Sequence, residues 1–242
     1  MDYRIQYLNN IIDLANSKLK NERNEIKRKV YKSTIDVAYK LIDKVNLENR
    51  IYKNDTDKIN TYVLGSKGKS FISRLIRKYQ RGFPYTHIAY AIDISEKNNP
   101  IVIEAWHIPY KPYYKPPFLK GGGIYLYNFS VLHTPETEFT IFCIQLTKRQ
   151  KRSLETFLLD KVYRSLKGQI HYDFKGILGF ATYSDYQNEQ NYFCSELVFD
   201  AYKRGAEINL LNFIPPYEVS PRIFLLTPYL KEVYTTKLIV NE

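Results

Sequence analysis

Hydrophobic and polar positions divide the chain into two regions that differ in periodicity. Over residues 2 to about 50, apolar side chains recur at helical spacing with many charges between them, which predicts two or three helices. Ser33 is the expected N-cap of the last of these helices. The polar segment NLENRIYKNDTDKIN then breaks the periodicity. We therefore predict an N-terminal helical extension over 1–55 and a second domain over 56–242.

The second region opens with short β-type runs separated by polar links such as SEKNNP, a spacing that favours an antiparallel meander. Prolines and three glycines in IPYKPYYKPPFLKGGG exclude a regular element and predict a long loop. A helix is expected between Thr147 and Gly168, a shorter one after Asp173, and a third in NYFCSELVFDAY. The expected strands are 61–64, 86–94, 100–106, 123–129 and 138–146. The fold class is thus α+β, with an antiparallel sheet or barrel packed against the last of these helices.

Composition narrows the classes of function. The 242 residues are 44% hydrophobic, enough for one sizeable core, and the formal charge of +11 is compatible with an anionic partner. Much of this charge lies in residues 18–32, where interspersed acids favour the solvated face of a helix. We expect no transmembrane segment and a cytoplasmic location, because the N-terminus lacks signal-peptide features and no apolar run approaches about 18 residues.

The two cysteines, Cys143 and Cys194, have no short paired spacing, which argues against a disulfide scaffold or a cysteine zinc site. Cys143 lies inside the apolar run EFTIFCIQL and is expected to be structural. Cys194 falls in the first turn of a predicted helix with Asn191 as the candidate N-cap, where the helix dipole favours a thiolate. This segment by itself is also compatible with a small buried thiol.

A nucleophilic thiolate needs a base, and His87 is the first candidate. Period-two alternation in THIAYAIDI puts His87 on one face with Ala89 and Ala91, which leaves room above the ring. If the next run pairs as a hairpin, Glu104 can lie beside His87 and accept its second ring N–H. Taken alone, His87 is also compatible with a hydrogen-bonded histidine on a half-exposed strand, and Glu104 with an ordinary exposed carboxylate.

The remaining histidines rank lower. His107 lies at a strand exit on the face opposite Glu104, where it is a second candidate for the base or a substrate contact. His133 and His171 are expected to be structural or surface groups. No metal-binding spacing of histidines or acids occurs, so we predict neither a metal nor a cofactor.

The order of His87, Glu104 and Cys194 along the chain resembles the circularly permuted papain fold of the NlpC-type superfamily, and most closely its YiiX-like cysteine peptidases and amidases. The matching segments, within residues 61–227, are FPYTHIAYAID, PIVIEAW, GIYLY, GQIHYDF, NYFCSELVFDAY and EVSPRIF. The sequence VLGSKGKS stands where the family has Gly-Asp before its first strand.

The resemblance implies a Cys194 nucleophile, a His87 base and Glu104 as the third polar residue. Tyr172 and Asp173 match the family's Tyr-Asp pair at the wall of the site, and Tyr85, Thr86, Trp106 and His107 are the other expected substrate-binding residues.

The implied reaction is hydrolysis of a peptide, isopeptide or peptidoglycan-type amide through an acyl-enzyme, with loop 108–120 lining the cleft. A lipid acyl hydrolase or acyltransferase of the same fold is one alternative. A non-catalytic scaffold, with its basic helices on a nucleic acid or a protein partner, is the other.

Overall fold

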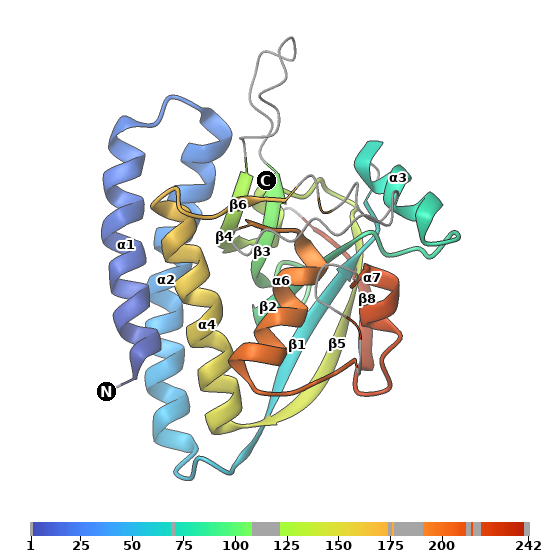
Figure 1. The fold of residues 1–242 in the computed structure, drawn as a ribbon. Coiled ribbons are helices and arrows are strands. Elements are labelled where there is room, and N and C mark those ends of the chain that lie inside the picture. The colour runs from blue at the N-terminus through green and yellow to red at the C-terminus, as the bar shows by residue number, and fades with distance from the viewer. Residues whose placement is uncertain are drawn as a thin grey trace.

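The computed structural model describes residues 2–68, 71–107, 122–173, 176, 191–211, 214 and 219–239. Over these ranges the chain is an α+β structure in which helices pack against a six-stranded antiparallel sheet (Figure 1). None of the helices in these ranges has the length and the apolar character needed to cross a membrane. The expected helix after Asp173 and the loop 108–120 lie outside the described residues, apart from the single position Gly176.

Helices and strands alternate irregularly along the chain. The helical elements are α1 (Tyr3–Asn21), α2 (Glu25–Ile51), α3 (Phe71–Tyr79), the short 3-10 turn η2 (Phe129–Val131), α4 (Lys148–Leu166), α6 (Cys194–Asp200), the π-helical turn η3 (Ala201–Gly205) and α7 (Pro221–Leu225). The strands are β1 (Lys58–Ser66), β2 (His87–Asp93), β3 (Ile101–His107), β4 (Gly122–Asn128), β5 (Glu138–Thr147), β6 (His171–Tyr172), β7 (Asn191–Tyr192) and β8 (Lys231–Lys237).

The strand order in the large sheet is β4-β3-β2-β1-β5-β8. The first four strands form the expected antiparallel meander, but β5 does not extend it. It crosses to the other side and pairs with β1 along its whole length, from Lys58 opposite Thr147 to Ser66 opposite Phe139. The simple meander was therefore wrong for β5, because local alternation reports a strand but not its neighbour. The edge strand β8 and helix α3 were not predicted.

The two N-terminal helices are longer than the sequence pattern suggested. Asn24 caps α2 by accepting the backbone N–H of Lys27 through its side chain at 3.0 Å. Ser33 lies in the interior of α2, where its buried Oγ accepts the backbone N–H of Asn128 at 3.1 Å. The prediction of Ser33 as an N-cap was wrong, since its hydroxyl serves a tertiary contact with the end of β4.

Helices α1, α2 and α4 lie together on one side of the sheet (Figure 1). Their buried side chains, such as Leu8 and Leu41, belong to the same hydrophobic cluster as strand residues such as Ile103. Burying a leucine of this kind contributes about 1.5–3 kcal/mol. The division at residue 55 falls in the link between α2 and β1 and stays a prediction, although the helices share their core with the sheet.

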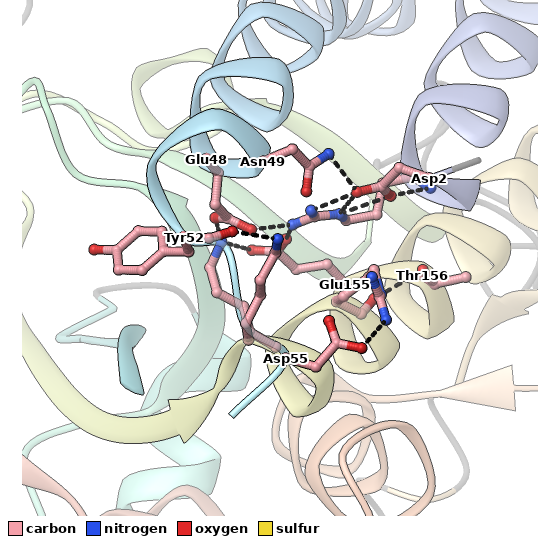
Figure 2. Close-up of polar contacts among 11 residues, drawn as sticks. Asp2, Glu48, Asn49, Tyr52, Asp55, Glu155 and Thr156 are labelled. Carbon is pink, nitrogen blue, oxygen red and sulfur yellow. Dashed lines mark hydrogen bonds and ion pairs between the residues drawn. The ribbon is translucent and has the colours of Figure 1, made fainter. Parts of the chain in front are cut away.

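A buried network of charges joins these three helices. The guanidinium of Arg4 in α1 pairs with Asp2 at 2.7 Å, Glu48 at 2.8 Å and Glu155 at 2.6 Å. Figure 2 shows these carboxylates of Asp2, Glu48 and Glu155 converging between the helices. Lys151 pairs with Glu48 and Glu155, so each buried acid meets a cation, as burial of a charge requires.

Candidate active site

Cys194 is the first residue of α6, as the sequence predicts. The preceding strand β7 pairs in parallel with β6, and the chain then passes through Phe193 in an extended conformation. Phe193 occupies the N-cap position, and its backbone N–H donates to Glu196 Oε2 at 3.5 Å. Asn191, the expected N-cap, is instead part of β7. Its assignment as the cap was wrong because the short strand uses the residues just before the helix.

Helix α6 is buried on nearly every side, which holds its first residue in place. Leu197, Val198 and Phe199 are fully buried, and α6 packs against β2 and β3. Ser195 and Asp200 are buried as well, so even polar residues of this helix lie inside the core rather than at the surface. The position of the Cys194 sulfur is thus set by packing of the whole helix against the two strands that carry the other candidate residues.

The thiol of Cys194 hydrogen bonds to the side chain of His87, and the backbone groups of Ile88 and Ser195 also contact it. Burial raises the pKa of the thiol, but the charge of His87 and these hydrogen bonds outweigh burial, so the pKa falls below its ordinary 9.0. Cys143 is the opposite case. It lies in β5, half-buried, and burial raises its pKa although Lys231 acts against this.

His87, the first residue of β2, hydrogen bonds to both Glu104 and Cys194. Its Nε2 contacts Glu104 Oε2, which leaves Nδ1 for Cys194. Burial lowers the pKa of His87, yet the negative charges of Glu104 and Cys194 raise it to about 10. Both shifts favour the ionised pair of a Cys194 thiolate and a His87 imidazolium. This is the state in which a thiol is ready to attack a carbonyl carbon.

Glu104 is fully buried in β3. Besides His87 on Oε2, it accepts hydrogen bonds on Oε1 from the hydroxyl of Tyr127 and from His133 Nε2, the latter at 3.0 Å. Burial raises the pKa of the carboxyl, but His133 and His87 hold it well below its usual range. Glu104 is consequently an anion, as the third member of a Cys-His-acid triad must be.

The hairpin prediction is confirmed by the register of β2 and β3, which pair antiparallel with Tyr90 opposite Ile103 and Ala91 opposite Val102. The same register continued by one residue sets Glu104 on the face of the hairpin that carries His87. The sequence therefore predicted the contact between Glu104 and His87 correctly, before any tertiary information.

His133 is predicted to be a structural or surface group, but the structure shows that it is buried and not at the surface. It is 8% exposed, its ring stacks on Phe129 with centroids 3.7 Å apart, and it lies 4.4 Å from the ring of Trp106. The residue follows η2 in a turn without periodicity, so no local pattern marked it. Tyr127 was also missed, although alternation in β4 puts it two residues from Tyr125, which is paired with Glu104.

Of the expected substrate-binding residues, Trp106 lies against the triad, with its ring centroid 4.7 Å from that of His87. Tyr172 is buried, and burial together with the charges of Cys194 and Glu104 raises its pKa. The ring centroids of His107 and Tyr172 are 6.3 Å apart. Asp173 is buried beside this pair, where its Oδ1 accepts the backbone N–H of Gly176 at 2.9 Å.

Tyr85 and Thr86 make other contacts. The hydroxyl of Tyr85 hydrogen bonds to Thr140 Oγ1 at 2.7 Å. Thr86 is buried, and its Oγ1 accepts the backbone N–H of Gly68 at 3.0 Å. The Tyr85 hydroxyl thus contacts β5 and that of Thr86 contacts the segment after β1, and their expected role in binding a substrate stays a prediction.

His87, Glu104 and His133 also form the one cluster, within the described part of the chain, whose side chains could hold a metal ion, with all ligand atoms within 4.8 Å of one another. Two imidazoles and a carboxylate are suitable zinc ligands. Here, however, Glu104 makes direct hydrogen bonds to both histidines, so an ion between the three side chains would have to replace these two contacts.

No family model, curated protein or solved structure matches the chain. The chemistry of the site therefore stands on its own geometry.

Proposed function

We propose that the protein is a cysteine hydrolase with a permuted papain-like fold, which cleaves an amide bond through Cys194, His87 and Glu104. The observation that carries the proposal is the unbroken chain of contacts from Cys194 to His87 and on to Glu104. These residues come from α6, β2 and β3, and all three are buried. A base oriented by a third group beside a nucleophile is the arrangement that covalent catalysis requires.

The charges of the three groups support the same reaction. The Cys194 thiolate attacks the carbonyl carbon, a C–S bond forms, and the carbonyl electron pair moves onto oxygen. Collapse of this intermediate breaks the C–N bond while His87 gives its proton to the leaving amine. Neutral His87 then takes a proton from water, whose oxygen attacks the thioester. The carboxylic acid leaves, and the thiolate and the imidazolium are restored.

The permuted fold is supported by the order of the elements. The strands that carry His87 and Glu104 precede the helix that carries Cys194, and that helix packs against both strands. Papain-type enzymes have the opposite order of cysteine and histidine, so a chain of this order requires the permuted connection. The six-stranded antiparallel sheet is compatible with this assignment.

Site-specific alkylation tests the proposal without knowledge of the substrate. At about pH 6 an ordinary thiol is almost fully protonated, whereas a thiolate in an ion pair reacts with iodoacetamide. Because the pKa of Cys194 is lowered and that of Cys143 is raised, mass spectrometry should find Cys194 modified first. His87→Ala should abolish this preference. Equal labelling of both cysteines, or labelling of Cys194 that persists in His87→Ala, would contradict the ion pair.

The bond cleaved is tested with paired probes that share one acyl group. We expect release of the amine from an amide probe by the wild type, and none by Cys194→Ser. If only ester or phospholipid probes are turned over, the lipid acyl hydrolase replaces the amidase. Absence of both thiol reactivity and turnover would leave the papain-like core as a binding scaffold.

A further inference from the structure

The two oxygens of Glu104 have different partners. Oε2 contacts His87, whereas Oε1 accepts from the hydroxyl of Tyr127 and from His133 Nε2. A carboxylate with donors on one oxygen only can rotate about its last torsion, which is broad and has a low barrier. The two donors on Oε1 remove this freedom, so they determine that Oε2 faces the imidazole of His87.

His133 is itself held in position. Its ring stacks on Phe129 at an interplanar angle of 19° and lies against Trp106, whose ring also contacts His87. Burial lowers the pKa of His133 even though Glu104 acts to raise it. The ring is thus neutral at ordinary pH, and because its Nε2 faces a carboxylate, Nε2 carries the proton. His133 therefore donates a hydrogen bond without adding a second positive charge beside His87.

We propose that His133 and Tyr127 are positioning residues for the reaction of Cys194. They hold Oε1 of Glu104, and through it they fix the orientation and the charge of His87. This inference rests on the proposed function, since it assigns a role to two further side chains at the same site. Neither residue touches Cys194 in the contacts described. Their hydrogen bonds reach His87 by way of Glu104, and the His133 ring also lies beside the His87 ring, with centroids 5.5 Å apart.

The use of these groups as a metal site is the competing interpretation. The same three side chains, His87, Glu104 and His133, converge within 4.8 Å. A metal bound by both imidazoles would take Nε2 of His87 away from Glu104 and would dispense with the hydroxyl of Tyr127. The two interpretations therefore differ in what loss of Tyr127 and addition of zinc should do.

Matched variants distinguish the effect of the His133 N–H donor from that of its aromatic ring. His133→Phe keeps an aromatic ring for Phe129 and Trp106 but removes the N–H, and His133→Gln restores an N–H donor. Tyr127→Phe removes only a hydroxyl. The readout is the rate of Cys194 alkylation between about pH 5 and pH 9, followed by mass spectrometry with Cys143 as the internal reference. Thermal unfolding of each variant checks that it is folded.

We expect a shift along the pH axis rather than a uniform loss. With Oε1 released, Glu104 stabilises the His87 imidazolium less well, so the pKa of His87 falls and that of Cys194 rises. His133→Phe and Tyr127→Phe should each slow alkylation at pH 6 by about 10-fold, and the double variant by about 100-fold, the range found when a hydrogen-bond partner of a metal ligand is removed. All rates should converge near pH 9, and His133→Gln should stay within about threefold of wild type.

The other titratable groups near Cys194 and His87 are the same in every variant, so they do not cause the expected shift in the pH profile. Among the described residues they are Glu104 from β3, Tyr172 from β6, Asp173 after it, and Glu196 in the first turn of α6.

Three results would overturn the inference. They are an unchanged pH profile in the double variant, an equal loss of rate at every pH, and a wild type that needs bound zinc for alkylation of Cys194. Failure of the proposed function would give another result, because Cys194 of the wild type would then be alkylated with the pH dependence of an ordinary thiol. A shifted wild type with unshifted variants would reject only the roles of His133 and Tyr127.

Discussion

The side chains of Cys194 and His87 hydrogen bond to each other, joining the first residue of α6 to the first residue of β2. Each changes the charge state of the other. The pKa of Cys194 falls below its ordinary value and that of His87 rises to about 10, so each shift favours the ionised pair. The first residues of a helix and of a strand that are far apart in the sequence thus form one reactive pair.

The first prediction concerns the pH range of this pair. Because the folded-state pKa of His87 is raised, its proton stabilises the fold most below the unfolded value of 6.5, and this contribution is lost as pH rises through about 10. We expect the NMR signals of the His87 ring to titrate near pH 10 in the wild type. In Cys194→Ala the midpoint should fall, since one of the two negative partners is gone. A His87 that titrates near 6.5 in both proteins would contradict the ion pair.

Glu104→Gln should impair the site while keeping its shape. The amide retains the size of the carboxylate but loses the charge that raises the pKa of His87, so alkylation of Cys194 at pH 6 and any turnover should drop by about 10²–10⁴-fold. Glu155→Gln is the matched control. It also removes a buried carboxylate, but from the network around Arg4. It should lower stability and leave the reactivity of Cys194 within about threefold of wild type.

Arg4→Met should destabilise the protein strongly. The methionine fills part of the space of Arg4 but leaves Asp2, Glu48 and Glu155 without their shared cation. Breaking a buried pair in this way lowers the free energy of unfolding by about 3–5 kcal/mol. Urea unfolding measures the loss. Lys29→Met, which removes an exposed pair with Glu25, should change it by less than about 0.5 kcal/mol. Equal stability of the two variants would show that the network contributes little.

Asp2→Asn tests the acid dependence of the same network. Burial alone would raise the pKa of Asp2, but hydrogen bonds from Arg4 and Asn49 and the charge of Arg4 lower it to about 2 from 3.8. A lowered carboxyl pKa gives stability that is present above 3.8 and is lost as pH falls through about 2. Asparagine can still cap α1. We therefore expect a lower melting temperature than wild type at pH 7, and a smaller further decrease between pH 4 and pH 2. Parallel melting curves for the two proteins across this range would be inconsistent with a charged Asp2.

Thr147→Ala should weaken the start of α4. Thr147 Oγ1 accepts the backbone N–H of Gln150 at 3.2 Å, and Gln150 Oε1 accepts that of Thr147 at 3.0 Å. Loss of the Thr hydroxyl should lower the free energy of unfolding by about 1 kcal/mol. Thr147→Ser, which keeps the hydroxyl, should recover most of it in the same urea titration. A serine variant as unstable as the alanine variant would point to the lost methyl group instead.

Several features were readable from the sequence because they depend on residues a few positions apart. The alternation around His87 and Glu104 predicted their strands and their contact across a hairpin. Thr147 and Gly168 marked the limits of α4, and Gly168 does adopt a left-handed φ of 76° just beyond its end. The position of Cys194 in a first helical turn followed from the apolar residues after it.

The sequence by itself therefore located most strands of the large sheet and the helices that begin after Thr147 and at Cys194, and it proposed Cys194, His87 and Glu104 as one group. Only the tertiary structure decided that β5 pairs with β1, that Ser33 serves the end of β4, and that His133 and Tyr127 reach Oε1 of Glu104. The physical reason is the range of each interaction. Capping and alternation act within a few residues. By contrast, a buried carboxylate takes its donors from whichever segments the closed chain brings to it, and no local pattern records which those are.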